Sequence, residues 1–187
     1  VQSIIEAVAA GQRVLRVNGR VPFSLDVQFM VIGGTEDAKW LSEKYHLSTF
    51  MLDVPPLSQR REDVAALFVQ KAAARKQLSA AGQRRLLTDK MRQILQSYTW
   101  PGNLAELERA VCRYLASLDQ AAHPTPRAKG ILLVQAIGEE ELLRSFVEEH
   151  PVLHTPPDST TLAQYQEAVE TLKELYYVSN EQVARAL

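Results

Sequence analysis

The first 57 residues alternate short apolar runs with turn residues, which is the pattern of a mixed α/β segment. Asn18-Gly19 separates two β-branched runs and predicts a tight hairpin, because both central residues of that turn need positive φ. The apolar run 29–32 does not alternate with polar residues, which favours a strand buried on both faces. Gly33-Gly34 has no lysine beside it, so it is expected to end that strand more than to approach a phosphate. The expected elements are a helix at 2–10, strands within 14–17, 21–32 and 50–54, and a helix at 35–45 capped by Thr35.

The apolar spacing becomes helical after Pro55-Pro56, with two interruptions. Residues 119–130 hold two Pro and one Gly and predict a linker, and 151–157 form a Pro-rich break. The apolar stripe of the helix that opens at 101–103 is Leu104, Leu107, Val111, Leu115 and Leu118. The other expected helices are 58–76 capped by Ser58, 88–98 capped by Thr88, an acidic one at 139–149, 161–177, and one that starts at Ser179-Asn180 and runs to Leu187.

Composition places the chain among ordinary soluble globular proteins, because 46% of its 187 residues are hydrophobic and 23% are charged. No apolar run approaches the ~20 residues that span a bilayer, so no membrane segment is expected. No charged-then-apolar leader opens the chain, and the single Cys112 cannot form an internal disulfide, which together favour a cytoplasmic location. The first residue is Val, so the chain is expected to be a piece of a longer protein.

Charge is balanced overall but segregated along the chain. Residues 58–118 carry 11 basic and 5 acidic side chains, a net charge of +6, whereas residues 139–187 carry 3 and 10, a net charge of −7. Such asymmetry indicates different partners for the two segments, or attraction between them. The basic residues that could contact DNA or a neighbouring subunit, or form a solvated face of the protein, are Arg84, Arg85, Lys90 and Arg92.

Several sequence blocks share a characteristic order and spacing. They are Arg16-Val17-Asn18-Gly19, Asp26-Val27, residues 50–57 (FMLDVPPL), 60–64 (RREDV), 98–103 (YTWPGN) and 106–109 (ELER). The most specific of them is the Trp-Pro-Gly-Asn turn with Glu-Leu three residues on. From 16 to 119, just over half of the chain, the sequence resembles the second half of the AAA+ domain of bacterial sigma-54-dependent transcriptional activators.

The resemblance implies an α/β fold with an all-α lid. In that fold, residues 1–57 are the distal strands of an AAA+ (P-loop NTPase-like) sheet, 58–119 a three-helix lid, 120–158 a linker with a short helix, and 159–187 a helical tail. Physical features of the blocks agree with it. Pro55-Pro56 stops a strand because proline lacks the ladder donor, and Glu62 and Asp63 suit the positive end of a helix dipole.

In this family the lid closes over the adenine of ATP or ADP and passes the nucleotide state to neighbouring subunits of a ring. The positions that the resemblance assigns to nucleotide binding are Arg60, Arg61, Asp63, Val64 and Asn103. The positions that it assigns to the lid pivot are Trp100, Pro101 and Gly102. The implied partners are further copies of the chain, sigma-54 RNA polymerase, and DNA through a C-terminal domain.

Four positions depart from the family pattern. Gly34 stands where the family has an Asn that positions the attacking water, and Trp40 and His46 stand at its trans-acting arginines. Ala105 replaces the lid arginine that reads the γ-phosphate, and losing a transition-state arginine typically costs ~10³-fold or more in rate. No Gly-x-x-x-x-Gly-Lys-Ser/Thr loop occurs in the chain. We therefore expect a degenerate module used for oligomerisation or nucleotide sensing; the alternatives are a working ATPase that remodels sigma-54 polymerase, and a scaffold that pairs with an active AAA+ partner.

The remaining candidate chemistry is weaker. His150 and His154 are four residues apart, but the prolines beside them break any helix, so loop histidines are expected and metal ligands are the alternative. Cys112 lies beside a core stripe, where thiols are usually inert, and a nucleophilic pair with His46 or His123 is the alternative.

The last nine residues, 179–187, resemble the opening of the helix-turn-helix in the Fis-like domain of the same family. The alternative is an ordinary four-helix tail. The net charge of −7 over 139–187 indicates that this part by itself does not bind DNA.

Overall fold

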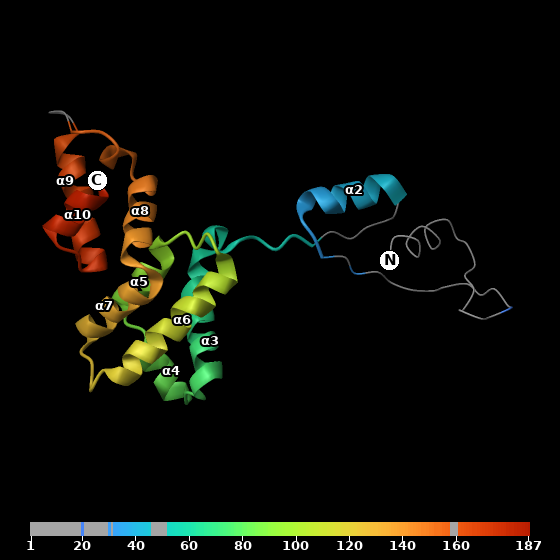
Figure 1. The fold of residues 1–187 in the computed structure, drawn as a ribbon, viewed down its shortest axis with the longest axis horizontal. Coiled ribbons are helices and arrows are strands. Elements are labelled where there is room, and N and C mark those ends of the chain that lie inside the picture. The colour runs from blue at the N-terminus through green and yellow to red at the C-terminus, as the bar shows by residue number, and fades with distance from the viewer. Residues whose placement is uncertain (1–19, 21–29, 31, 46–51, 158–160) are drawn as a thin grey trace. The chain divides into compact units, whose positions relative to one another are not determined.

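The computed structural model describes residues 20, 30, 32–45, 52–157 and 161–187. The chain divides into two compact units, Val1–Val54 and Pro55–Leu187. All regular elements among the described residues are helices (Figure 1). None of these helices combines the length and the apolar composition that crossing a bilayer requires.

The described part of the first unit is centred on α2 (Thr35–Tyr45), which confirms the helix predicted there. Glu36 and Asp37 lie in its first turn, where the helix dipole favours negative charge. The Asp37 carboxylate also accepts a hydrogen bond of 3.0 Å from the Gly34 N–H. The helix begins at Thr35 itself, whereas the sequence predicted Thr35 as the cap that precedes it.

The predicted sheet is not confirmed. The elements that lie outside the described residues are the helix at 2–10, the hairpin at Asn18-Gly19, and the strands at 14–17 and 21–29. Met30, Ile32 and residues 52–54 are described, and they are exposed and belong to no strand. A strand is defined by ladder hydrogen bonds to a neighbouring strand, and these residues have no such neighbour within the described part of the chain. The sheet therefore stays a prediction.

The lid segment contains four helices where three were predicted. They are α3 (Arg61–Lys76), α4 (Ala80–Leu86), α5 (Asp89–Ser97) and α6 (Asn103–Gln120), preceded by the 3-10 turn η1 (Leu57–Gln59). Because η1 occupies 57–59, α3 starts at Arg61 and Ser58 does not cap it. The missed helix, α4, is capped by the Ser79 side chain, which accepts a hydrogen bond of 3.2 Å from the Gly82 N–H. Thr88 caps α5 as predicted.

The lid core is formed by the inner faces of α3, α5 and α6. The predicted stripe on α6 is buried at Leu107, Val111 and Leu115, whereas Leu104 in the first turn is 39% exposed and Leu118 in the last is half-buried. Burying each such side chain stabilises the fold by ~1.5–3 kcal/mol. The middle of α6 therefore contributes most to the core, and Leu118 packs against the edge of it.

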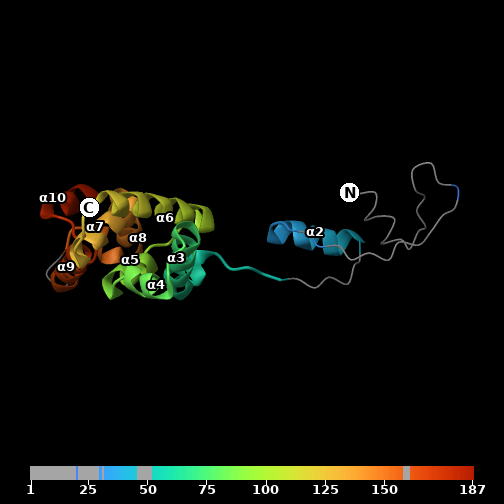
Figure 2. The same cartoon turned by 90° about the horizontal axis from the view of Figure 1, so that it is seen from below.

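Helices continue directly after the lid. They are α7 (Pro126–Ile137), α8 (Glu139–Glu149), α9 (Leu162–Tyr176) and α10 (Asn180–Ala186), with the 3-10 turn η2 (Pro151–Leu153) after α8. The acidic helix and the capped terminal helix are confirmed, and Ser179 forms a capping box with Gln182. In Figures 1 and 2, α9 and α10 lie together at one end of this unit, and α3 and α4 lie toward the other.

The linker predicted at 119–130 is wrong. α6 continues to Gln120 and α7 begins at Pro126, so only a short connection separates them. The N–H groups in the first turn of a helix have no partner within the helix, so Pro126, which has no N–H, is well tolerated there. The Thr125 side chain caps the helix by accepting a hydrogen bond of 3.2 Å from the Ala128 N–H. Gly130 lies inside α7, where an added Cβ would lie 2.6 Å from the Tyr177 ring. Pro126 thus begins α7, and Gly130 allows α7 to pack closely against Tyr177.

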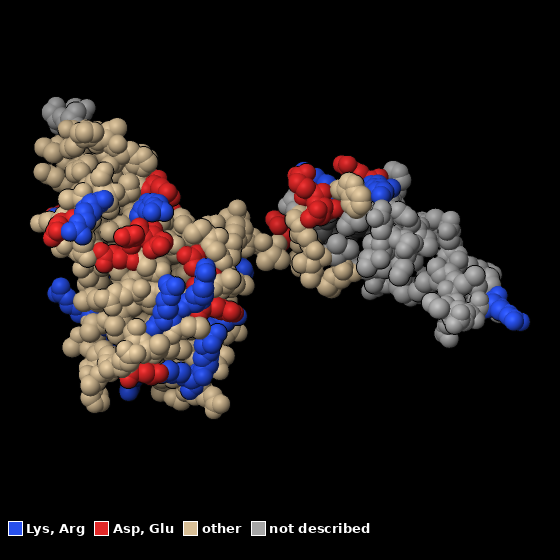
Figure 3. All heavy atoms as spheres, in the orientation of Figure 1, with Lys and Arg blue, Asp and Glu red and all other residues tan. Residues whose placement is uncertain are grey.

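The charge segregation of the sequence persists on the surface. In the view of Figure 3, Lys and Arg atoms gather over the α3–α6 part of the second unit, and Asp and Glu atoms are more frequent toward α8. Ion pairs between helices include Lys71–Glu108 and Lys76–Asp119, which join α3 to α6. Such exposed pairs contribute little each, about 0–1 kcal/mol.

Candidate functional site at the Trp-Pro-Gly-Asn turn

The turn between α5 and α6 is anchored by the Trp100 side chain. Its indole is 1% exposed and its Nε1–H donates a hydrogen bond of 2.8 Å to the Leu95 carbonyl near the end of α5. The Tyr98 ring meets it edge-on with a centroid distance of 5.1 Å. Trp100 has a φ of 54°, a left-handed conformation that packing and the indole hydrogen bond must hold in place. The position of α6 relative to α5 therefore depends on this residue.

Glu106 closes the turn from the other side. Its carboxylate accepts hydrogen bonds of 2.7 Å from the Tyr98 hydroxyl and of 2.7 Å from the Gly102 N–H. Burial, and then the bond to Glu106, raise the pKa of the Tyr98 phenol above its usual range. A Cβ on Gly102 would lie 2.8 Å from the Glu106 Cβ, so glycine permits this close approach. The block that carries the family resemblance is thus a locally closed structure.

Asn103 joins this turn to the start of the lid. Its side-chain Oδ1 accepts a hydrogen bond of 2.9 Å from the Leu57 N–H, 46 residues earlier in the chain. Asn103 has a φ of 49°, a left-handed conformation that asparagine tolerates better than most residues. Leu57 is fully buried beneath this contact. The structure therefore brings Leu57, at the start of the lid, together with Asn103, and the Asn103 carboxamide oxygen is engaged by this contact.

The other positions assigned to nucleotide binding have different surroundings. Val64 is fully buried in the core, so it cannot face a ligand from this position. Asp63 is exposed in the first turn of α3. Arg60 is half-buried, and its Nε is buried without a hydrogen-bond partner among the described residues.

Arg61 is engaged by a residue that the sequence did not single out. Its guanidinium forms a two-pronged ion pair with Glu149 at the end of α8, with one N–H···O distance of 3.0 Å, and its Nε donates to the Ser58 carbonyl at 3.2 Å. The hydrogen bond from Arg61 holds the pKa of the Glu149 carboxyl below its usual value, and the same bond raises the pKa of Arg61. The first helical residue of the lid is therefore tied to α8.

Two further polar contacts attach the later helices to the same turn. The Ser97 and Tyr176 hydroxyls lie 2.8 Å apart, and the Thr99 and Ser145 hydroxyls lie 3.2 Å apart. Burial raises the pKa of Tyr176 to about 12. These two pairs link the residues on either side of Tyr98, just before Trp100, to α9 and α8, and Arg61–Glu149 links the start of α3 to the end of α8. Spacing along the sequence could not reveal them, because the partners are 46 to 88 residues apart.

The four substituted family positions fall in different parts of the structure. Ala105 is exposed in the first turn of α6, directly after the turn described above. Gly34 is exposed before α2, and Trp40 lies within α2 with the Lys44 ammonium 4.7 Å above its ring. His46 lies outside the described residues. Ala105 is therefore the substitution whose surroundings can be described in detail.

The two histidines four residues apart have different partners. His150 Nδ1 lies 2.7 Å from the Phe146 carbonyl, and its ring stacks on the Phe146 ring at 3.8 Å. His154 Nε2 lies 2.9 Å from the Val147 carbonyl. Within the described ranges, no group of three or more His, Cys, Asp or Glu residues could hold a metal ion. Both histidines fasten the end of α8, which is the role expected of loop histidines.

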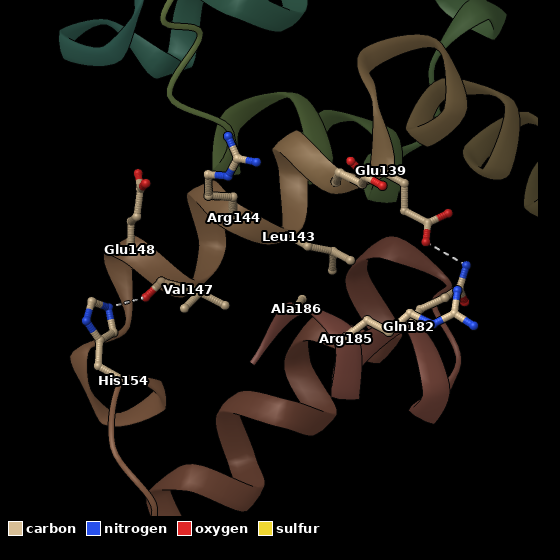
Figure 4. A pocket seen from close by; sticks show the side chains of 10 residues that line it. Glu139, Leu143, Arg144, Val147, Glu148, His154, Gln182, Arg185 and Ala186 are labelled. Carbon is tan, nitrogen blue, oxygen red and sulfur yellow. Dashed lines mark hydrogen bonds between the residues drawn. The ribbon is translucent and has the colours of Figure 1, made fainter.

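A hollow of about 370 Å³ lies between α8, η2 and α10 (Figure 4). Its apolar wall is formed by Leu143, Val147 and Ala186. The polar side chains that line it are Glu139, Glu140, Arg144, Glu148, His154, Gln182 and Arg185. Carboxylates and guanidinium groups are mixed around it, so its charge selects neither anions nor cations. Sequence reasoning missed this hollow because its two helices are distant in the chain.

Comparison with known proteins identifies the class to which this geometry belongs. Residues 58–125 match the AAA+ ATPase lid domain, a segment that contains α3–α6 and the Trp-Pro-Gly-Asn turn. Relatives that match over most of the chain are named DNA-binding transcriptional regulators and activators. The resemblance inferred from the sequence blocks is therefore confirmed.

Three relatives illustrate the match. The DNA-binding transcriptional regulator NtrC of Salmonella typhimurium is 30% identical over 179 residues, which cover 88% of this chain and 34% of that protein. The transcriptional regulatory protein ZraR of Klebsiella oxytoca is 32% identical over 117 residues, 57% of this chain and 26% of that protein. The DNA-binding transcriptional activator HyfR of Escherichia coli is 30% identical over 171 residues, 88% and 24% respectively.

The chain spans about a third or less of the length of these relatives. No solved structure matches it. The chain is therefore similar to transcriptional regulators, and its residues 58–125 match an AAA+ lid.

Proposed function

We propose that this chain is part of a transcriptional regulator resembling sigma-54-dependent activators, in which the AAA+ module oligomerises or senses ATP or ADP without efficient hydrolysis. The observation that carries this proposal is Ala105. It follows an intact Trp-Pro-Gly-Asn turn whose tryptophan, glycine and asparagine all make the contacts described above. The turn that positions the family's lid arginine is thus present in this chain, but the arginine itself is replaced by alanine.

The chemistry of this position supports a loss of catalysis. An arginine at 105 would present a charged, multi-donor group to a terminal phosphate, whereas an alanine methyl presents neither charge nor donor. Phosphoryl transfer depends on such groups for electrostatic stabilisation, at ~10³-fold or more in rate for one arginine. Because Ala105 is exposed, the fold has room for a longer side chain there.

The test compares the full-length wild-type protein with its Ala105→Arg variant. We expect calorimetry to show nucleotide binding by the wild type, without steady turnover in an ATPase assay. Ala105→Arg should tighten ATP binding relative to ADP by roughly tenfold, since it adds a charge-assisted hydrogen bond. Ala116→Arg, at another exposed position of α6, is the matched control and should change neither. Steady hydrolysis by the wild type at ordinary AAA+ rates would refute the proposal.

One observation favours the alternative of a working ATPase. Arg109 lies one helical turn after Ala105 on α6, and its Nη2 would lie 3.5 Å from a Cβ on Gly102. A guanidinium is therefore present near the start of α6 although position 105 lacks one. If the full-length protein hydrolyses ATP and Arg109→Gln abolishes this without unfolding the lid, Arg109 has taken over the missing role.

The partners follow from the same class. We propose assembly with further copies of the chain, contact with sigma-54 RNA polymerase, a cytoplasmic setting, and α10 as the first helix of a DNA-binding helix-turn-helix. The capping box at Ser179 supports α10 as a helix that starts independently. A pull-down followed by a gel shift separates this proposal from a scaffold, which would co-assemble with an active AAA+ partner and bind no DNA.

A further inference from the structure

A second basic surface is assembled from four helices of the Pro55–Leu187 unit. The sequence drew attention to α4 and α5 through Arg84, Arg85, Lys90 and Arg92. The structure adds α7 and α9: the Lys129 Nζ donates to the Arg85 carbonyl at 3.5 Å, and a hollow of about 450 Å³ brings Lys90, Arg127 and Lys173 together. We name this surface the α5–α7 basic face and define it by its seven cations. They are Arg84, Arg85, Lys90, Arg92, Arg127, Lys129 and Lys173.

Tyr177 organises the centre of the α5–α7 basic face. The Lys90 ammonium lies 4.6 Å from the centroid of its ring, and the Arg127 guanidinium carbon lies 5.9 Å from it. Gly130 gives the ring its space on α7, because a Cβ there would lie 2.6 Å from it. Lys90 and Arg127, which are 37 residues apart in the sequence, are therefore positioned beside one half-buried aromatic ring.

The positive charge of this face is only partly neutralised. Lys173 pairs with Glu170 at 2.8 Å, Arg92 lies 4.0 Å from Asp89, and Glu174 lines the hollow. The other five cations have no carboxylate within ion-pair distance in the described part of the chain; they are Arg84, Arg85, Lys90, Arg127 and Lys129. On α3, Lys71 and Lys76 have carboxylate partners on α6, while Arg75, Arg109 and Arg113 on these two helices have none within ion-pair distance among the described residues. A group of unpaired cations on one surface is typical of a site that binds an anionic partner.

The geometry points to the phosphate backbone of duplex DNA as that partner, and we propose that the α5–α7 basic face binds it without reading sequence. The N-termini of α5 and α7, capped by Thr88 and Thr125, lie beside Lys90 and Arg127, and helix N-termini favour phosphate oxygens. The cations come from separate helices, which suits a row of phosphates better than one carboxylate. The face is separate from α10 and needs no nucleotide hydrolysis, and it rests on the proposed function only in assigning the chain to a DNA-associated regulator.

Binding of the 187-residue chain to a mixed-sequence duplex, measured by fluorescence anisotropy at several salt concentrations, tests this proposal. If four of the five unpaired cations each meet a phosphate, log affinity falls against log salt with a slope of about −3.6. The affinity then drops on the order of 100-fold between about 50 and about 200 mM salt. The double variant Lys90→Gln/Arg127→Gln should reduce the magnitude of the slope by about 2.

A charge-matched control removes two arginines that do not belong to the α5–α7 basic face. Arg75→Gln/Arg144→Gln removes two exposed arginines from α3 and α8 and should leave slope and affinity unchanged. If the first double variant does not fold, Arg84→Gln/Arg85→Gln removes two exposed charges that do not contact the Tyr177 ring and should give the same decrease.

Three results would overturn the proposal: no duplex binding by the wild type, equal losses in the variant and its control, or binding to polyglutamate in place of the duplex. The last result would assign the face to an acidic protein. Steady ATP hydrolysis by the full-length protein would refute the proposed function and leave this salt dependence intact, so the two failures are distinguishable.

Discussion

The lid helices α3–α6 and the helices α7–α10 belong to one compact unit but are specified in different ways. The turn that defines the lid is closed within twelve residues, from Leu95 to Glu106, by contacts between near neighbours. The helices α8 and α9 are attached to the same turn by side chains 46 and 79 residues away, Ser145 and Tyr176. A motif can therefore be recognised in sequence while the surfaces that surround it stay hidden.

The largest expected effect concerns the lid turn. Trp100→Ala should lower the free energy of unfolding by about 3–5 kcal/mol, because it removes a fully packed indole and leaves the Leu95 carbonyl without its donor. Urea unfolding near pH 7 measures the change. Leu104→Ala, four residues on and exposed, should cost under about 0.5 kcal/mol. Equal losses in the two variants would mean that the indole does not hold the turn.

Asn103→Ala should cost about 2–3 kcal/mol, because it leaves the Leu57 N–H unpaired and places an alanine at a left-handed φ. Asn103→Gly loses the same hydrogen bond but tolerates that φ, so it should be the more stable of the two by about 1 kcal/mol. Urea unfolding of both variants separates the contact from the backbone conformation. A glycine variant as stable as the wild type would show that the Leu57 contact contributes nothing.

The attachment of α9 should be weaker than the turn itself. Tyr176→Phe removes the hydroxyl that meets Ser97 and keeps the ring, and should cost about 1 kcal/mol. Hydrogen exchange should show the loss of protection in α9 before α5. Tyr165→Phe removes a hydroxyl from the same helix without such a partner in the described structure and is the control. If protection in α5 falls as much as in α9, the two regions unfold together.

The smallest effect is the pH-dependent ion pair between Arg61 and Glu149. The folded-state pKa of Glu149 is below its unfolded value, so its contribution is present above about pH 4.3 and is lost as the pH falls through the folded pKa. Both side chains are about one-third exposed, which limits the contribution to under about 1 kcal/mol. Glu149→Gln should therefore destabilise near pH 7 and have no effect in acid. Glu148→Gln, the exposed neighbour, should show no such pH dependence.

The sequence predicted those features whose cause is local. The cap at Thr88, the acidic α8, the middle of the α6 stripe and the capped α10 depend on residues within a few positions of one another. The predicted linker failed because the same proline that breaks a helix interior suits its first turn, and Pro126 stands in that first turn after the Thr125 cap. α4 was missed because Gly82, three residues after its cap Ser79, also indicates a turn.

The candidate site was predictable only in part. The Trp-Pro-Gly-Asn turn follows from a specific block of residues, and the structure gives each of Trp100, Gly102 and Asn103 a contact. Burial of Val64 and the pairing of Arg61 with Glu149 depend on how α3 packs, which the residues near them do not encode. Nucleotide binding at these positions stays a prediction.

The packing of α7 against α6 has a practical consequence for anyone who isolates the lid. The recognised lid segment ends at residue 125, one residue before α7 begins. Ending the chain there would remove the buried side chains Leu133, Val134 and Ile137 of α7. It would expose the apolar surface of α6 against which α7 packs. The isolated lid is thus expected to aggregate or unfold. Because α8 and α9 also contact the lid, the smallest soluble fragment should extend past α9.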